Sequence, residues 1–263
     1  MKKGMVKTPD EIAALLRGGK LLSRVLRELV RAVRPGVTTD TLDGLARRGI
    51  AKAGGRPSFL GYRVPGAPRP FNSAVCTSRN EEVVHAPALP GRPLAEGDLI
   101  GLDIGMEHPA RDGYFTDMAV TVPVGTVGEG ARTLIRVTRE CLMRGVDAAR
   151  AGARLSHIGR AVQEHAESHG FGVVRDLVGH GVGYAVHEDP RVPNYVDPDY
   201  PDLTLREGMV LAIEPMITAG EPAVRTSSDG WTVVTEDGSL AAHWEVTVAV
   251  TARGPRILTP LPV

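Results

Sequence analysis

The sequence is poor in the residues that mark several classes of protein. Its 263 residues include two cysteines, Cys76 and Cys141, too few for a disulfide framework. The formal net charge is zero, which excludes the overall basic excess typical of nucleic-acid-binding proteins. No apolar run approaches a membrane span, and the basic N-terminus lacks the apolar stretch of a signal peptide. We therefore expect a soluble protein located in the cytoplasm.

Apolar residues, by contrast, are plentiful. They make up 42% of the chain, enough to bury a large core in one or two domains. No linker rich in proline, glycine or serine divides the sequence, and no segment is of low complexity. We therefore expect one domain over residues 1–263.

Helical spacing of apolar residues indicates two pairs of helices. Thr8, Pro9 and Glu11 form a capping box at the start of the first helix, which Pro35 and Gly36 follow. The other helices are expected after Thr39-Asp40 up to Gly54-Gly55, from about Gly130 to Ala149, and from about Ile158 up to Gly170.

The two helix pairs are related by a shift of 116 residues. This shift places Gly36 on Gly152, Leu42 on Ile158 and Gly54 on Gly170. Strand-like sequence follows each pair: Ser73–Thr77, Val83-Val84 and a hairpin after the first, and Val173–Val178, Met209–Ile213, Trp231–Thr235 and Trp244–Val250 after the second. We expect two pseudo-repeats, about 8–125 and 126–252, related by a pseudo-twofold axis with a cleft between their sheets.

The hairpin is the stretch Leu99–Thr121, with its turn in Pro109–Gly113. Each arm carries one aspartate, Asp103 or Asp117, among apolar and β-branched residues. A buried carboxylate costs several kcal/mol unless a cation or hydrogen bonds compensate it. A metal ion would relieve both aspartates. The alternative is that either side chain faces solvent or caps the turn.

Three further candidate ligands lie in the second half. His180 stands between glycines in GHGVG, Glu214 ends the apolar run LAIEPM, and Glu245 lies in HWEVT. Taken singly, each glutamate could point outward and the histidine could belong to a turn. Together, four carboxylates and one imidazole call for about four positive charges, which two divalent ions would supply. Oxygen-rich donor sets of this kind suit Mn(II), Fe(II), Co(II) or Zn(II), which activate water near neutral pH.

These five residues, within DIG, TDMAVT, GHGVG, IEPM and WEVT, resemble the type I methionine aminopeptidases of the pita-bread metallopeptidase superfamily. The resemblance runs from KTPDEIAALLRGGKL to VTVAVT. It implies an α+β pita-bread fold, in which two pseudo-twofold-related halves with antiparallel sheet enclose a dinuclear metal cleft. It also implies hydrolysis that removes the initiator methionine from nascent proteins and peptides whose second residue is small.

The resemblance assigns a role to each ligand. It implies that Asp103 chelates one ion, Asp117 and Glu245 bridge both, and His180 with Glu214 completes the second. Glu214 would also shuttle a proton from the bridging hydroxide nucleophile to the leaving amine. The cofactors would be two divalent ions per subunit, from among Co, Mn, Fe, Zn and Ni.

By the same resemblance, His85 contacts the substrate near the scissile amide, and His187 hydrogen-bonds its carbonyl and stabilises the oxyanion. The alternative for both is a surface histidine in a loop. Tyr62, Cys76 and Trp231 match positions that line the methionine pocket, where soft and aromatic groups suit a thioether. A buried free thiol and a core tryptophan are compatible with that pocket.

Four features depart from the family pattern. The hairpin between the two aspartates is about three residues longer, which would alter the rim of the cleft but leave the ligands in place. Val246 replaces a histidine, so that a partner of Glu245 would be missing. The segment 63–72 is long and proline-rich, so no pocket residue can be carried over there. Phe59 replaces a small residue and would tighten the pocket.

Two other interpretations stay open. Xaa-Pro aminopeptidases and prolidases share the five ligands, but they usually carry a further N-terminal domain. A binding module that has lost its chemistry is the other, against which the complete ligand set argues. The 34 positions between His180 and Glu214 leave no room for the insert of type II relatives, and no Cys/His cluster precedes Asp103.

The expected partners are peptides and nascent chains with an N-terminal methionine. We expect a monomer without membrane contact or nucleic-acid sequence recognition, and ribosome association would be transient. The basic residues Lys2, Lys3 and Lys7 are expected to form a solvated tail rather than a ribosome-docking site.

Overall fold

A computed structural model describes residues 4–262 of the chain. The helices form where the apolar spacing predicts them. At the first helix start, the Thr8 hydroxyl accepts a hydrogen bond from the Glu11 backbone N–H, and the Glu11 carboxylate accepts one from the Thr8 backbone N–H at 2.8 Å. The helices are α1 (Pro9–Ala32), α2 (Thr39–Lys52), α3 (Glu129–Ala148) and α4 (Ser156–Ser168).

The strands are more numerous and shorter than the sequence indicates. The predicted strand at Ser73–Thr77 lies further along the chain, at Cys76–Arg79, and only Gly172–Val173 is strand near the predicted Val173–Val178. The strands are β1 (Arg56–Pro57), β2 (Cys76–Arg79), β3 (Glu82–Val84), β4 (Leu99–His108), β5 (Tyr114–Pro123), β6 (Gly172–Val173), β7 (Gly179–Gly181), β8 (Glu188–Val192), β9 (Val210–Ile213), β10 (Met216–Thr218), β11 (Val224–Thr226), β12 (Val233–Thr235), β13 (Ala241–His243), β14 (Glu245–Thr251) and β15 (Gly254–Ile257).

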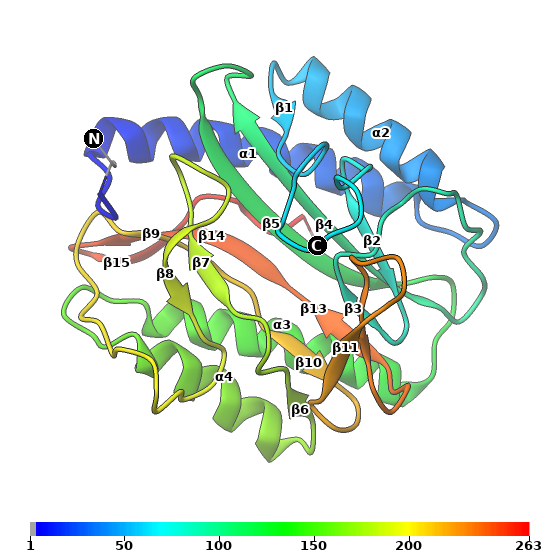
Figure 1. Ribbon diagram of the computed structural model, residues 1–263. Coiled ribbons are helices and arrows are strands. Elements are labelled where there is room, and N and C mark those ends of the chain that lie inside the picture. Colours follow the sequence, from blue (N-terminus) through cyan, green and yellow to red (C-terminus); the bar gives the residue numbers. More distant parts are fainter. Residues whose placement is uncertain (1–3, 263) are drawn as a thin grey trace.

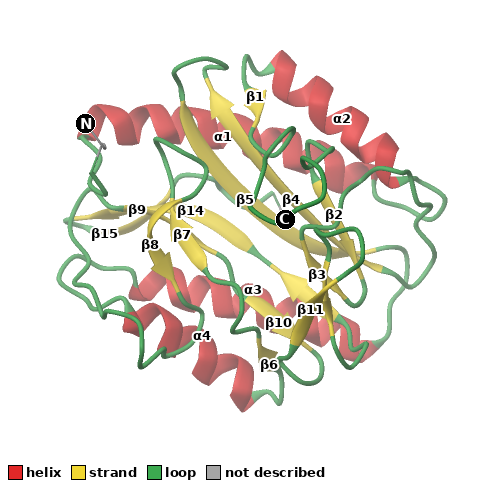
Figure 2. Cartoon of the chain, viewed as in Figure 1, coloured by secondary structure: helices red, strands yellow, loops and turns green. Residues whose placement is uncertain are grey.

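One large antiparallel sheet runs through the molecule in the order β1-β4-β5-β14-β9-β7-β8, with β2 and β15 pairing to β4 and β14. Helices α1 and α2 lie along the upper part of Figure 1, and α3 and α4 along the lower part. Figure 2 shows the strands between these two helix pairs. Apolar residues of both pairs meet the sheet in one core cluster, so the helices cover the same sheet face.

Strand alternation separates this core from the opposite face. Leu102 and Ile104 join the core with the helices, so the side chain of Asp103 between them points the other way. In β14, Val246 is fully buried in the same core, whereas its neighbour Glu245 faces the side of Asp103. The two side chains lie on opposite sheet faces, and the buried Oε1 of Glu245 has no hydrogen-bond partner, so the missing partner of Glu245 stays a prediction.

Backbone geometry repeats between the two halves. Gly36 and Gly152 both adopt the left-handed conformation, with φ of 85° and 84°. Their N–H groups donate to the carbonyl oxygens of Leu94 and Leu205, each at 2.8 Å. The turns after the first helix of each pair are therefore the same.

The strands of the two halves meet through a reciprocal pair of threonines. The Thr121 hydroxyl on β5 donates to the His243 carbonyl oxygen at 2.9 Å, and the Thr247 hydroxyl on β14 donates to the Asp117 carbonyl oxygen at 2.8 Å. The Asp117 and His243 N–H groups return hydrogen bonds to the same threonine hydroxyls. This exchange joins β5 to the end of β13 and to β14, and it places a local twofold relation at the centre of the sheet.

The hairpin tip at residues 109–113 packs toward the helices. The Ala110 N–H donates to the Gly54 carbonyl oxygen, and His108 lies against Gly18 of α1. No residue of this turn lines the large cavity described below. The extra hairpin length therefore does not alter the rim of the cleft.

Lys7 departs from the expected solvated tail. Its side chain has no exposed surface, and its Nζ lies 2.6 Å from the Glu188 Oε2. Lys2 and Lys3 lie outside the described residues. Within residues 4–262, no helix has the length and apolar character needed to cross a membrane.

Candidate active site

Five neighbouring strands of the large sheet bring the five predicted ligands together. Asp103 of β4 and Glu245 of β14 are both in register with Ala119 of β5, one on each side. Asp117 lies two residues before Ala119, so its side chain shares the same sheet face.

The remaining two candidates continue this row across the sheet. His180 of β7 pairs with Ala212 of β9, and Glu214 lies two residues after Ala212. The strand order β4-β5-β14-β9-β7 therefore carries four carboxylates and one imidazole on adjacent strands. All five residues line a single cavity.

The side chains lie at metal-ligating distances. One potential ligand atom from each of Asp117, His180 and Glu245 lies within 4.8 Å of the other two. The Nε2 of His180 is 3.4 Å from the Glu214 Oε1. The His180 Nδ1 lies 2.9 Å from the Gly181 carbonyl oxygen, to which an Nδ1–H donates, so Nε2 presents its lone pair to the cavity.

Without a cation, burial makes the charged form of these four carboxylates unfavourable. Burial, with the charge of Glu214, raises the pKa of Asp103 to about 8, and burial also raises the pKa of Glu214 to about 8. The pKa values of Asp117 and Glu245 are raised well above the usual range by burial and by the neighbouring carboxylates. Cations among these groups would reverse the shifts by favouring the charged forms.

The residues fit a divalent metal centre. The Oδ1 of Asp103 and the Oε1 of Glu245 are buried and have no hydrogen-bond partner. Buried polar atoms are rarely left unpaired, because each loses its interaction with water. An oxygen-rich donor set with one imidazole is the kind that Mn, Fe, Co and Zn ions prefer.

Two further histidines, His85 and His187, line the same cavity as the five candidate ligands. His85 follows β3 with a φ of 61°, a left-handed conformation that is uncommon outside glycine, and its ring lines the cavity. Burial, together with the neighbouring His187, lowers the pKa of His85 to about 4. Burial also lowers the pKa of His187, so both imidazoles are neutral near pH 7.

His187 contacts Tyr62 on one side and the candidate metal ligand His180 on the other. The Tyr62 hydroxyl is 2.8 Å from the His187 Nδ1, and the His187 ring packs edge-on against the His180 ring at 4.4 Å between centroids. A Tyr62 O–H donated to Nδ1 leaves the proton of the neutral imidazole on Nε2. Sequence and structure therefore agree that Tyr62 and His187 belong to one site.

The cavity has a volume of about 1190 Å³, and one wall is an apolar cluster. Cys76 and Trp231 belong to this cluster and are 3% and 8% exposed. Burial and the charges of Asp103 and Asp117 raise the pKa of the Cys76 thiol well above its usual value, so it stays a neutral, soft apolar group.

Phe71 and Phe59 add two aromatic rings to the pocket wall, and Phe71 was not assigned to the pocket from the sequence. Phe71 packs edge-on against Trp231 at 5.2 Å between ring centroids, and it comes from the segment 63–72 in which no pocket residue could be assigned. Phe59 packs against Phe71 at 6.4 Å and lines the same cavity. Phe71 is the only aromatic residue of its proline-rich segment, a signal that could have identified it.

His243 is the other residue that the sequence left without a role. It is 3% exposed, and its Nε2 lies 3.4 Å from the Glu214 Oε2. Burial lowers the pKa of His243 to about 3, so the ring is neutral, and its Nε2 has no hydrogen-bond partner. Its position two residues before Glu245 could have indicated that both share a sheet face.

Comparison with known proteins agrees with this geometry. Residues 13–252 match the model of the metallopeptidase family M24. The methionine aminopeptidase of Clostridium acetobutylicum is 47% identical over 256 residues, which cover 97% of this chain and 98% of the relative.

Solved structures give the same relationship. The crystal structure of the methionine aminopeptidase from Thermotoga maritima superimposes with a TM-score of 0.89 at 42% identity, covering 97% of this chain and 98% of that one. The prolidase from Pyrococcus furiosus shares the fold, with a TM-score of 0.72 at 21% identity, and this chain covers 65% of its length. The architecture is thus the pita-bread fold, and the chain belongs to metallopeptidase family M24, among its methionine aminopeptidases.

Proposed function

We propose that this protein is a type I methionyl aminopeptidase, a hydrolase that removes the N-terminal methionine from peptides and nascent proteins whose second residue is small. The observation that carries the proposal is the row of Asp103, Asp117, Glu245, Glu214 and His180 on five adjacent strands, beside an apolar pocket. Nearly full-length identity of 47% to a methionine aminopeptidase supports the same substrate class.

In this proposal the five residues hold two divalent ions. By the family resemblance, Asp103 would hold one ion, Asp117 and Glu245 would contribute to both, and His180 with Glu214 would complete the second. When bound, such ions polarise a carbonyl group and lower the pKa of water toward neutrality. The donor set admits Co, Mn, Fe, Zn or Ni, and a deprotonated carboxylate set is required for any of them.

The chain's own groups then move protons and orient the substrate. Glu214 takes a proton from the attacking water and passes it to the leaving amine, because its carboxylate faces the cavity beside the other ligands. His187 donates from Nε2 to the carbonyl oxygen of the scissile bond, where negative charge develops. His85, which lines the same cavity near His187, would contact the scissile amide.

The pocket supports methionine as the residue removed. Tyr62, Phe71, Cys76 and Trp231 present aromatic and sulfur surface to the cavity. A thioether makes favourable contacts with aromatic rings and with polarisable sulfur. Phe59 narrows the same wall, so we expect a pocket that fits an unbranched side chain better than a branched one.

Three finer points belong to the same proposal and rest on the family resemblance. We propose one catalytic domain over residues 1–263, with pseudo-repeats at about 8–125 and 126–252. We further propose a cytoplasmic monomer that meets nascent chains near the ribosome. Lys7 takes no part in such a contact, since its ammonium group is buried against Glu188.

Two peptides test the proposed reaction. Metal-free protein is supplied with Mn(II), Co(II) or Fe(II) and given Met-Ala-Ser or Ala-Pro-Ser. We expect metal-dependent release of methionine from Met-Ala-Ser and no cleavage of Ala-Pro-Ser. Cleavage of Ala-Pro-Ser alone would move the chain to the proline-directed branch, and silence on both with metal bound would make it a binding module.

A further inference from the structure

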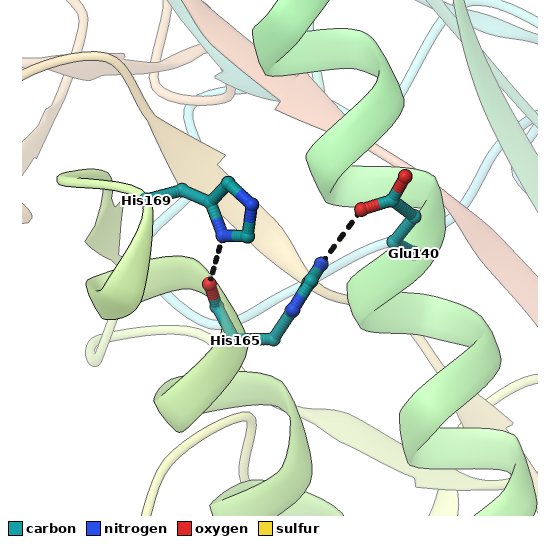
Figure 3. A group of neighbouring side chains, drawn as sticks. All are labelled: Glu140, His165 and His169. Atoms are coloured by element: carbon teal, nitrogen blue, oxygen red, sulfur yellow. Dashed lines mark hydrogen bonds and ion pairs between the residues drawn. The ribbon is translucent and has the colours of Figure 1, made fainter.

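A second group of candidate metal ligands lies on the helices, outside the cavity. Glu140 projects from α3, His165 from α4, and His169 directly follows the end of α4 (Figure 3). We call these three residues the helix-pair cluster. None of them lines the cavity of the active site, and the proposed reaction gives them no task.

The distances within the helix-pair cluster suit a shared ion. The His165 Nε2 lies 2.8 Å from the Glu140 Oε2, and the two histidine rings stand 4.5 Å apart at 62°. One potential ligand atom from each residue lies within 4.8 Å of the others. Two donors bound tetrahedrally to one Zn²⁺ lie about 3.4 Å apart, so only side-chain rotation separates this arrangement from a metal site.

Hydrogen bonds at the back of the cluster already orient its ligand atoms. The His169 Nδ1 lies 2.8 Å from the His165 carbonyl oxygen, to which Nδ1–H donates, so the lone pair is on Nε2. Arg136 donates to the Glu140 Oε1 at 2.8 Å and leaves Oε2 for His165. Metal-ligating histidines and carboxylates are typically held in this way by a second partner.

The cluster combines one largely buried imidazole, that of His165, with two more accessible groups, of which His169 is exposed. The His165 side chain is 10% exposed, whereas the Glu140 side chain is 39% exposed and leaves a path for an ion. In Figure 3 the His165 ring extends from α4 toward Glu140, and the His169 ring lies beside it. The three side chains therefore converge between the two helices.

We propose that the helix-pair cluster is a second metal site, selective for Zn²⁺ or a similar borderline ion, that fastens α4 to α3. Two imidazoles and one carboxylate form a frequent three-residue zinc set, with water as the fourth ligand. The ion takes the place of the proton that His165 Nε2 shares with Glu140. This donor set is richer in nitrogen than the carboxylate-dominated cleft, so the two sites favour different metals.

The competing explanation is purely structural. His165 would only hydrogen-bond Glu140 across the helices, and His169 would only cap the carbonyl at the end of α4. The substitution His169→Asn distinguishes the two explanations, because an asparagine side chain keeps an N–H donor for the carbonyl but removes the imidazole ligand. His157→Asn is the matched control, since His157 is exposed on the same helix and outside the cluster.

The test is equilibrium dialysis of the full chain against Zn²⁺ alone. The unmodified protein and His157→Asn are expected to bind one more zinc per chain than His169→Asn. Zinc should also raise the melting temperature of the unmodified protein further than that of His169→Asn, because a ligand that binds only the folded state stabilises it. Equal zinc content in all three proteins would overturn the proposal.

Peptidase activity separates this proposal from the proposed function. Mn-loaded His169→Asn should hydrolyse Met-Ala-Ser as the unmodified protein does, because the cluster lies outside the cleft. Glu140→Gln, which keeps one ligand oxygen but loses the charge, should weaken zinc binding at the same site. Retention of the extra zinc by both variants would assign the cluster a structural role only.

Discussion

At the scale of single residues, the site consists of carboxylates and imidazoles whose pKa values are shifted so that the charged form of each is disfavoured. Four carboxylates with raised pKa values share a cavity with His85, His180 and His187, whose pKa values are lowered. Burial shifts acids and imidazoles in opposite directions, since it disfavours the charged form of each. Near pH 7 the imidazoles are therefore neutral and can donate hydrogen bonds. The carboxylates need a nearby cation to favour their charged form. Neutral imidazoles are the basis of the predictions for His187 and His243.

His187→Ala should lower kcat for Met-Ala-Ser by about two to three orders of magnitude, the effect of losing one donor to the oxyanion. The KM should change much less, because the lost interaction strengthens as charge develops. Tyr62→Phe is the milder comparison, since it keeps the ring and removes only the hydroxyl that faces His187. Steady-state kinetics of both variants measure this, and an unchanged kcat in His187→Ala would refute the assigned role.

His243→Ala should lower kcat about tenfold or more, since the neutral His243 imidazole holds its buried Nε2 3.4 Å from the Glu214 Oε2, within reach of a proton-transferring carboxylate. His243→Gln restores an N–H donor and should recover most of the loss. Metal content is measured alongside kcat and KM, so that a loss of ions is distinguished from a loss of positioning. Equal activity of the alanine and glutamine variants would show that His243 acts by packing alone.

At the scale of elements, the sequence predicts which strands carry ligands but not how the strands are ordered. The hairpin of β4 and β5 follows from its apolar arms and turn, and both predicted aspartates lie there. Strand β14, which lies between β5 and β9, is distant from both in sequence. Short pieces such as β7 and β10 have too few residues for a periodic pattern, so sequence periodicity could not locate them.

The face of each strand follows from alternation once one register is known. Asp103 and Glu245 both flank Ala119, a relation that requires β5 to lie between β4 and β14. The same alternation places the Val246 side chain in the helix-covered core, on the sheet face opposite Glu245. Family resemblance predicts five ligands that the sheet does bring to one cavity, but it does not supply the surroundings of each side chain.

The segment before β8 carries His187 and depends on a buried ion pair. Glu188 contacts the Lys7 ammonium at 2.6 Å and also accepts from the backbone N–H of Ala185 at 2.7 Å. Removing one partner of a buried pair costs several kcal/mol, because the other charge stays buried. The N-terminal segment thus contributes to the position of His187.

Lys7→Ala should therefore reduce the free energy of unfolding by about 3 kcal/mol. It should also lower kcat, because Glu188 loses a partner directly beside His187. The matched control is Lys20→Ala, an exposed position on α1, for which we expect a change within about 0.5 kcal/mol. Urea unfolding of the two variants measures the difference, and similar stabilities would show that the Lys7 contact contributes little.

At the scale of the whole molecule, the duplication visible in the helices extends to the sheet. Gly36 and Gly152 are related by 116 positions, but Thr121 and Thr247 are related by 126. The offset changes because the connecting segments differ in length between the halves. A single sequence shift therefore detects the helix pairs and loses the strands, although the glycine turns and the threonine hydrogen bonds repeat in both halves.

In the proposed reaction, hydrolysis depends on two divalent ions held in the cleft. The most direct measurement titrates metal-free protein with Mn(II), follows methionine release from Met-Ala-Ser, and counts the ions bound when the rate saturates. Mn(II) is chosen because it prefers oxygen ligands, which the cleft offers. The helix-pair cluster is richer in nitrogen and should therefore contribute little to the count of bound Mn(II). We expect no methionine release without metal and saturation of the rate at two ions per chain. Release by the metal-free protein, or saturation at one ion, would contradict the proposed reaction.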